Sequence, residues 1–210
     1  NTYLAGAIGP TCQGLVPYNN LLINSNTTFA PGTYTLQNGI TIYSNDIALD
    51  CQGSTLLGSA SGNGITNTQY ARVHIKNCNI QNYSTGISLY ASSCYYGYYP
   101  DNNLIESNTL SGNGYGLSTY SCGQPSKHTI KSNTITGSST GLSLQSSQDL
   151  VTQNTLSSNY YGLFLYSTNS NITQNTLTNN SQGGIYLSGS QNTITQNLLD
   201  NPSFAINLQG

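Results

Sequence analysis

The chain has 210 residues, of which only four are Lys or Arg and six are Asp or Glu, so charged residues make up 5% of it against about 25% in an average soluble protein. Nucleic acid is excluded as a partner, because binding phosphates takes a cluster of Lys and Arg, and electrostatic attachment to a membrane is excluded for the same reason. No apolar run approaches the roughly 18 to 20 residues of a membrane span.

The composition indicates export. The sequence starts at Asn1, contains no Met, and has five Cys, none in a C-x-x-C pair, which favours disulfides over a metal site. Four Asn-x-Ser/Thr sequons are present, at Asn26, Asn82, Asn171 and Asn179. We therefore expect an extracellular or cell-surface protein, its leader removed, with N-glycans at these four residues and with no cofactor or metal.

Residues 1–18 precede the repeats that organise the rest of the chain. Their stretch Tyr3–Pro10 is apolar and has no evident place in the repeat register. We predict an N-terminal extension over 1–18 and a single repeat domain over 19–210. The extension either folds back as a cap or docks on another copy of the chain.

A motif of Gly or Ala followed by apolar, any, apolar residues recurs from residue 39 to the C-terminus, at steps of 25, 22, 30, 25, 21, 22 and 21 residues. Its first apolar positions are Ile40, Ile65, Ile87, Leu117, Leu142, Leu163, Ile185 and Ile206. Apolar and polar residues alternate within each repeat, which predicts short strands with one buried face. The period is too short for a propeller blade of about 40 to 45 residues. The sequence therefore predicts an all-β, single-domain parallel β-helix of about eight coils, each 21–25 residues long except one of 30.

A second motif, apolar-x-x-Asn-x-apolar, lies between successive copies of the first. Its Asn residues are Asn108, Asn133, Asn154, Asn175 and Asn197. Because coils stack in register, we expect these side chains to form a ladder in which each amide bonds to the coils on either side.

The candidate catalytic residues are Arg72, His74 and Lys76, which alternate with apolar residues and should project outward from one strand. The repeat register also aligns Asp50, Lys76, Glu106 and Lys131 in one outward column of alternating sign. We favour the column as a solvent-facing ion-pair ladder over catalysis. Asp101, Asp149 and Asp200 are expected in turns of different coils, and His128 is expected to be structural.

The cysteines suggest two disulfides. Cys51 and Cys78 fall at similar register in adjacent coils, and Cys94 and Cys122 fall in neighbouring expanded coils. Cys12 is left over, and is either free, exchanged into one of these pairs, or bonded to another subunit.

Tyrosines mark the longest repeat, which contains Tyr95, Tyr96, Tyr98 and Tyr99. We expect this insertion either to bind sugars or a protein partner, or to pack as a lid on its own coil. Four further tyrosines lie four residues after a repeat Gly and should form a partial outward column: Tyr43, Tyr90, Tyr120 and Tyr166.

Over residues 36–210 the sequence resembles the right-handed parallel β-helix repeat family, which includes pectate lyases, alginate epimerases, copper-processing accessory proteins of the bacterial periplasm, and surface proteins. Residues 47–53 and 73–78 resemble the opening coils of archaeal surface proteins. The resemblance implies a right-handed fold and export, but no single activity, because the family hosts many functions. Lyases of the family use Arg or Lys beside clustered carboxylates, usually with Ca²⁺, and that cluster is not evident here.

The last repeat, from Ala205, has no polar cap. An open β-helix end invites another strand, and a head-to-tail contact between unlike ends propagates as a filament. We therefore expect a non-enzymatic structural subunit of an extracellular filament or surface layer, whose partners are other copies of the chain and N-glycans. The alternative is a secreted β-helix protein that binds surface carbohydrate or degrades a polysaccharide as a lyase.

Overall fold

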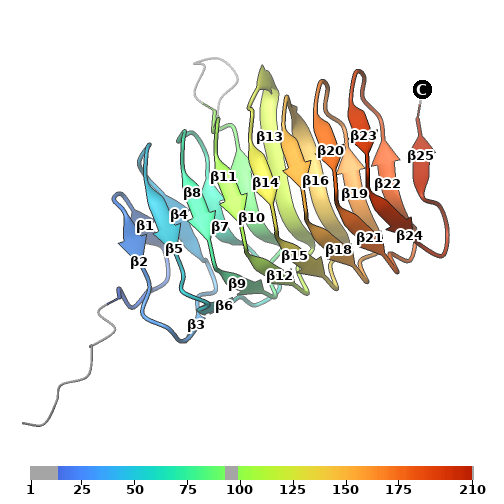
Figure 1. Cartoon of the computed structure of the whole chain (residues 1–210). Helices are drawn as coiled ribbons and strands as arrows, with labels where there is room; N and C mark the ends of the chain where they lie inside the picture. Colours follow the sequence, from blue (N-terminus) through green and yellow to red (C-terminus); the bar gives the residue numbers. More distant parts are fainter. Residues whose placement is uncertain (1–13, 93–98, 210) are drawn as a thin grey trace, which may run out of the picture.

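The computed structural model describes residues 14–92 and 99–209. In these ranges all regular elements are strands, and successive coils stack side by side from β1 at one end to β25 at the other (Figure 1). No helix in this part of the chain is long and apolar enough to cross a membrane. The strands are parallel and lie in three sheets, so the parallel β-helix of about eight coils predicted from the sequence is confirmed.

Each coil contributes one strand to each sheet. Sheet 1 has nine strands, which are, in spatial order, β1 (Leu21–Ile23), β4 (Ile40–Ile42), β7 (Asn63–Asn67), β10 (Thr85–Tyr90), β13 (Tyr115–Pro125), β16 (Thr140–Ser147), β19 (Tyr161–Leu165), β22 (Gly183–Leu187) and β25 (Ile206–Leu208). Sheet 2 has eight strands, which are β2 (Thr27–Thr28), β5 (Ala48–Asp50), β8 (His74–Lys76), β11 (Leu104–Glu106), β14 (Thr129–Lys131), β17 (Leu150–Thr152), β20 (Asn171–Thr173) and β23 (Thr193–Thr195). Sheet 3 also has eight, which are β3 (Thr33–Thr35), β6 (Thr55–Leu57), β9 (Asn79–Gln81), β12 (Thr109–Ser111), β15 (Thr134–Thr136), β18 (Thr155–Ser157), β21 (Thr176–Thr178) and β24 (Leu198–Asp200).

The core is a set of aliphatic ladders inside the coils. The ladder expected in sheet 1 is formed, since Ile87 pairs with Leu117 and Leu117 with Leu142 in register. Sheets 2 and 3 add the central residues of their three-residue strands, as the fully buried Ile105 and Leu110 do in one coil. Near the two ends of the solenoid these central residues, Tyr34, Ile194 and Leu199, are only partly buried. Burial of each aliphatic side chain contributes roughly 1.5 to 3 kcal/mol.

The repeat glycine bends the chain into sheet 1. At Gly141 a Cβ atom would lie 2.5 Å from the carbonyl oxygen of Gly162 in the next coil and 3.2 Å from Asn159 Nδ2. Both the glycine and the residue after it therefore face the core, as the buried pair Gly141 and Leu142 shows. In consequence the residue before the glycine points outward, together with the second and fourth residues after it.

Polar ladders close the corner between sheets 2 and 3. Asn154 Oδ1 accepts hydrogen bonds from the backbone N–H and the side-chain amide of Asn133, both at 2.9 Å. Asn154 Nδ2 donates to Asn175 Oδ1 at 2.9 Å and to the carbonyl of Ile130 at 2.8 Å. The same pattern links the five Asn residues expected from the sequence. The residue before each has positive φ, for example 58° at Gln153, which turns the backbone so that the amide points inward.

The other two corners have ladders that the sequence analysis did not predict. The corner between sheets 3 and 1 uses Asn113, Asn159, Asn180 and Asn201, and it is interrupted at Ser138, whose buried hydroxyl has no hydrogen-bond partner among the described residues. The corner between sheets 1 and 2 uses Asn103, His128, Asp149, Ser170 and Asn192. Side chains at all three corners thus satisfy backbone N–H groups that the turns would otherwise leave buried without a partner.

The end of the predicted N-terminal extension contacts the first coil. Leu15, which belongs to this extension, forms a parallel bridge with Phe29. Its N–H donates to the carbonyl of Thr28 and its carbonyl accepts from the N–H of Ala30. Leu15 therefore extends sheet 2 beyond β2. Residues 1–13 lie outside the described residues, so their role as cap or docking segment stays a prediction.

Asn154→Ala should lower the free energy of unfolding by about 2 to 4 kcal/mol, because the backbone N–H of Asn133 and the carbonyl of Ile130 both lose buried partners. Urea unfolding followed by circular dichroism measures the change. Ser157→Ala, an outward change on β18 of the same coil, is the matched control and should cost less than about 0.5 kcal/mol. Equal effects of the two substitutions would show that the ladder contributes no specific stability.

Candidate functional site

The outer face of sheet 2 carries the charged column expected from the sequence. Lys76 Nζ lies 3.5 Å from Asp50 Oδ2, and Lys131 Nζ lies 2.8 Å from Glu106 Oε2. His74 Nε2 lies 2.7 Å from Glu106 Oε1, on the side away from Lys131 along the sheet. Surface pairs of this kind each contribute roughly 0 to 1 kcal/mol, so the column is a modest stabilising feature.

The two carboxylates of the column are held ionised. The hydrogen bond from Lys131, helped by the charge of His74, lowers the pKa of Glu106 below its ordinary 4.5, although burial opposes this. At Asp50 burial again opposes ionisation, but a hydrogen bond from Asn77 and the charge of the neighbouring lysine outweigh it, and the pKa falls below 3.8. The stability that these groups contribute is therefore present above about pH 4.5 and is lost as the pH falls through their lowered pKa values.

Arg72 is not on the strand with the other two candidate residues, as the alternation had suggested. It lies in the turn before β8 with a φ of 55°. Its guanidinium makes a two-bond ion pair with Asp46, with Nη2 donating to Oδ2 at 2.8 Å. His74 and Lys76 do share the outer face of β8, but each has its own acidic partner. The three side chains therefore do not converge on a substrate position.

Asp149 lies in the turn between β16 and β17, as expected, but the sequence analysis did not foresee that its side chain is a buried part of the corner ladder. It is 1% exposed. Its carboxylate accepts from the backbone N–H of His128 at 2.8 Å and from the hydroxyls of Ser126 and Ser146. His128 is equally buried, and its Nδ1 accepts from the N–H of Asn103. Burial lowers the pKa of His128 below 6.5, with the charge of Asp149 opposing the shift, so the ring is neutral in the fold.

The remaining acids do not form a catalytic group. Asp200, also expected in a turn, is the last residue of β24, and Asp101 precedes β11 on a different coil. In the ranges 14–92 and 99–209, no three His, Cys, Asp or Glu side chains lie close enough to hold a metal ion.

Cys51 and Cys78 form a disulfide between adjacent coils, with their Cα atoms 4.8 Å apart. Cys122 is also disulfide-bonded. Its expected partner Cys94 and the fifth cysteine, Cys12, lie outside the described residues.

All four sequon asparagines are exposed. Asn26 and Asn171 lie at the start of sheet 2 strands, and Asn82 and Asn179 lie at the corner between sheets 3 and 1. Of the insertion tyrosines, Tyr95, Tyr96 and Tyr98 lie outside the described residues, and Tyr99 is half-buried. Their expected binding role stays a prediction.

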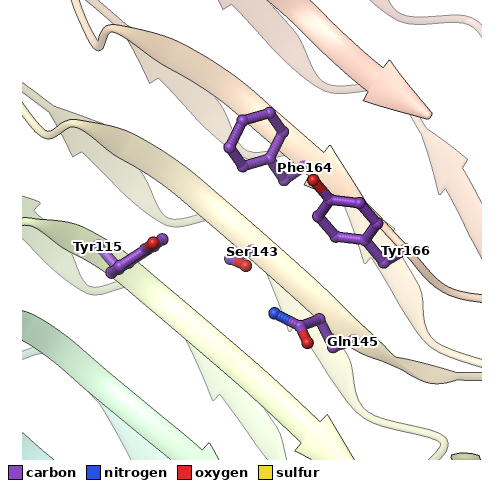
Figure 2. Close-up of a pocket in the computed structure, with 5 residues that line it drawn as sticks. All are labelled: Tyr115, Ser143, Gln145, Phe164 and Tyr166. Carbon is purple, nitrogen blue, oxygen red and sulfur yellow. The ribbon is translucent and has the colours of Figure 1, made fainter. Parts of the chain in front are cut away.

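A hollow lies elsewhere on the surface, on the outer face of sheet 1. It has a volume of about 380 Å³ and is lined by Tyr115, Ser143, Gln145, Phe164 and Tyr166. Figure 2 shows Ser143 and Gln145 between Tyr115 on one side and Phe164 and Tyr166 on the other. We call it the sheet 1 groove.

The floor of the groove is β16, whose outward residues are small or polar. They are Thr140, Ser143 and Gln145, in the slots that follow from the bend at Gly141. Thr140 and Ser143 are each only 3% exposed although they face outward, because larger side chains on the adjacent strands overhang them. Among the described residues, neither the Ser143 hydroxyl nor the Gln145 amide is hydrogen-bonded to a protein group.

The walls of the groove are aromatic. On the β19 side the ring of Phe164 packs against Tyr161, Tyr166 and Tyr186, with centroid distances of 4.5, 5.8 and 5.2 Å. On the opposite side Tyr115 and Tyr120 belong to β13, and Tyr120 stacks on Tyr90 with their centroids 5.2 Å apart. Packed rings keep their positions, so the β19 wall is preformed.

The groove is uncharged. None of the nine strands of sheet 1 contains Asp, Glu, Lys or Arg. Burial raises the pKa of the Tyr166 hydroxyl, and the neighbouring Tyr186 and Tyr115 add to the shift, so this hydroxyl stays protonated at ordinary pH. Rings beside hydroxyl and amide groups offer apolar faces and hydrogen bonds but no acid–base pair.

The sequence analysis identified only part of this site. It placed Tyr120 and Tyr166 in an outward column, but it did not assign Tyr115 or Phe164 to the outer face. Strict alternation would turn Tyr115 inward, and only the bend at the repeat glycine reverses this. Aligning the repeats on their glycines and reading every slot would have shown one coil without rings between coils that have them.

A family model described as "Periplasmic copper-binding protein (NosD)" matches residues 19–207. Among solved structures, the chain is similar to the A-module of the Azotobacter vinelandii mannuronan C-5 epimerase AlgE6, with a TM-score of 0.60 and 14% identity. The alignment covers 92% of this chain and 60% of that module, so the likeness shows the fold alone. A comparison with curated protein sequences gives no match. The expected similarity to archaeal surface proteins stays a prediction.

His128→Asn should remove one cause of the loss of stability of the fold at acidic pH. The pKa of His128 in the folded chain lies below 6.5, so on acidification the unfolded chain takes up a proton that the folded chain does not. The free energy of unfolding of the wild type therefore falls as the pH drops below 6.5, by at most about 1.4 kcal/mol per pH unit. Asn occupies the same ladder slot in Asn103 and Asn192, so the variant should fold. Urea unfolding from about pH 8 to about pH 5 measures both profiles, and parallel profiles would contradict the assignment.

Proposed function

The chain belongs to the family described as periplasmic copper-binding protein (NosD), and within it we propose an exported β-helix protein that binds carbohydrate in the sheet 1 groove. Export is supported by this membership and by the disulfide between Cys51 and Cys78, because disulfides persist in oxidising compartments.

Copper does not fit the side chains that the structure describes. Copper in proteins is held by thiolate, thioether and imidazole groups. The chain has no Met, Cys51, Cys78 and Cys122 are oxidised, and the imidazole of His128 is buried within a corner ladder. His74, the other histidine, faces solvent beside a carboxylate on sheet 2. We therefore assign no step to copper.

The observation that carries the proposal is the composition of the groove. Aromatic rings line the groove on both sides, and the Ser143 hydroxyl and the Gln145 amide at the floor have no protein hydrogen-bond partner among the described residues. The C–H faces of sugars pack on aromatic rings, and sugar hydroxyls can both donate to and accept from Ser and Gln side chains. The two polar groups are therefore free to bond to a ligand in the groove.

We propose binding without turnover. Cleavage or epimerisation of a sugar chain needs acid and base groups within reach of the bound sugar, and the charged column of Asp50, Lys76, Glu106 and Lys131 is on sheet 2. The separation of the charges from the groove supports a binding protein over a lyase or epimerase.

N-glycosylation at Asn26, Asn82, Asn171 and Asn179 remains part of the proposal. All four side chains are exposed, and none lies within a sheet 1 strand. Glycans at these positions would therefore leave the groove open.

Head-to-tail assembly is a second candidate, supported by the exposed edge of β25. On this strand Leu208 occupies an inward slot in register with Leu187, yet it is 71% exposed, and Ile206 is 39% exposed. A further coil would cover both residues and pair with the backbone of β25. We propose that β1 of another copy supplies it, which would build the filament or surface layer expected from the sequence.

Phe164→Ser should weaken carbohydrate binding about tenfold, the effect of losing about 1.4 kcal/mol of ring contact. Ser occupies the same slot at Ser143, so the backbone should tolerate the change. A glycan array identifies the wild-type ligand, and isothermal titration with it compares the variants. Tyr43→Ser, an exposed ring at the other end of sheet 1, is the control and should bind as wild type. Absence of any wild-type binding across the array would overturn the proposed function.

Leu208→Lys should abolish assembly, because it puts a charge into the apolar slot that a docking coil would cover. Negative-stain microscopy and light scattering should show elongated particles for wild type and single subunits for the variant. Leu150→Lys, on the outer face of sheet 2, is the matched control and should still assemble. Wild-type particles that stay monomeric at high concentration would exclude this candidate and leave the groove proposal untouched.

A further inference from the structure

The side chains around the sheet 1 groove define the direction in which the groove runs. Along β13 the outward slots hold Tyr115, Ser118 and Tyr120. On β19 and directly after it they hold Tyr161, Phe164 and Tyr166. The strand between them, β16, has no ring in any slot. The groove is therefore a trench parallel to β16 that runs across the axis of the solenoid. A ridge of three rings bounds it on the β19 side, and a ridge of two rings, interrupted by Ser118, bounds it on the β13 side.

The trench is narrow. Strands of a sheet lie about 4.8 Å apart, so the two ridges, which are two strands apart, are separated by about 9.6 Å. Each van der Waals contact takes about 3.5 to 4.0 Å, which leaves room for one ring between the ridges. The length of β16, eight residues at about 3.3 Å each, allows several sugar units in a row.

The trench also selects against charge. A carboxylate that enters it would lose water between apolar rings, and sheet 1 has no Lys or Arg on its strands to replace that water. Lys76 and Lys131, the lysines of the charged column, lie on sheet 2 and bond to acids there. Neutral sugars meet no such penalty, because the hydroxyls of Ser143 and Tyr166 and the amide of Gln145 match their hydroxyl groups.

From this geometry we infer that the groove takes a chain of uncharged pyranose sugars lying along β16, across the solenoid axis, and excludes polyuronates. The inference rests on the proposed function and gives it a substrate class and an orientation. Ser143 and Gln145 form the floor of the groove, and we place the other end of the bound chain over Thr140, the next outward slot of β16.

Larger side chains that occur at the same register position in neighbouring coils can be placed in the trench without changing the backbone. Ser143→Phe copies Phe164, its partner in register on β19, and blocks the middle of the floor. Thr140→Tyr copies both Tyr115 and Tyr161, which flank it, and blocks one end only. Thr66→Phe introduces the same ring in the same slot on β7, three coils from the trench, and is the control. Thermal unfolding by circular dichroism establishes that each variant is folded.

Titration calorimetry of the full chain with neutral hexasaccharides of glucose, mannose and xylose, and with hexamannuronate, tests the inference. We expect at least one neutral hexasaccharide to bind at least tenfold more tightly than hexamannuronate. Ser143→Phe should reduce that binding at least tenfold and Thr66→Phe should leave it unchanged. Thr140→Tyr should weaken the hexasaccharide but not the disaccharide of the same sugar.

The outcomes separate this inference from the proposal on which it rests. Tighter binding of hexamannuronate that Ser143→Phe abolishes would overturn the neutral-sugar inference and leave carbohydrate binding in place. Unchanged hexasaccharide affinity in Thr140→Tyr would overturn the orientation along β16. Binding that survives Ser143→Phe would overturn the trench as the site, and binding of no saccharide by wild type would overturn both the inference and the proposed function.

Discussion

Hydrogen bonding from coil to coil at the three corners is the constraint on which this solenoid depends. A coil of 21 or 22 residues turns three times, and each turn leaves backbone N–H groups facing the interior, where no water reaches them. Asn154 shows the solution, since its amide bonds to the coil before it, the coil after it and the backbone. A neutral amide makes these hydrogen bonds without burying a charge. The interior can therefore hold many polar groups although the chain has few ionisable residues.

Once the corners and the aliphatic ladders are fixed, the outward slots are free to vary from coil to coil. This freedom is visible in sheet 1, where one register position holds Thr66, Ser88, Ser118, Ser143, Phe164 and Tyr186 in successive coils. A groove forms where a coil with small outward residues lies between two coils with aromatic outward residues. It needs no insertion and no loop, only a local change of side-chain size on an unchanged backbone.

This separation between a repeated interior and a variable exterior decides what the sequence could predict. The Gly-apolar-x-apolar motif and the Asn154 slot recur at constant spacing, so the architecture, the strand register and one corner ladder followed from periodicity. The ladder between sheets 1 and 2 was missed because its residues vary in type: His128, Asp149 and Ser170 occupy one slot without a shared identity. The ladder between sheets 3 and 1 repeats Asn159, Asn180 and Asn201 at a constant step, so the same reading of periodicity could have found it. The groove was missed because the bend at Gly116 turns Tyr115 outward, against the alternation that holds elsewhere in the strand.

The same variability gives the low charge content a physical meaning. On sheet 2 the charges alternate in sign along one column, so Glu106 has a cationic neighbour on each side and the column is nearly neutral as a whole. On sheet 1 charges are absent from the strands. A ligand therefore meets no long-range field that would steer or repel it, and recognition rests on contact alone. For the carbohydrate binding proposed above, shape and hydroxyl matching in the trench, not electrostatic attraction, would supply the specificity.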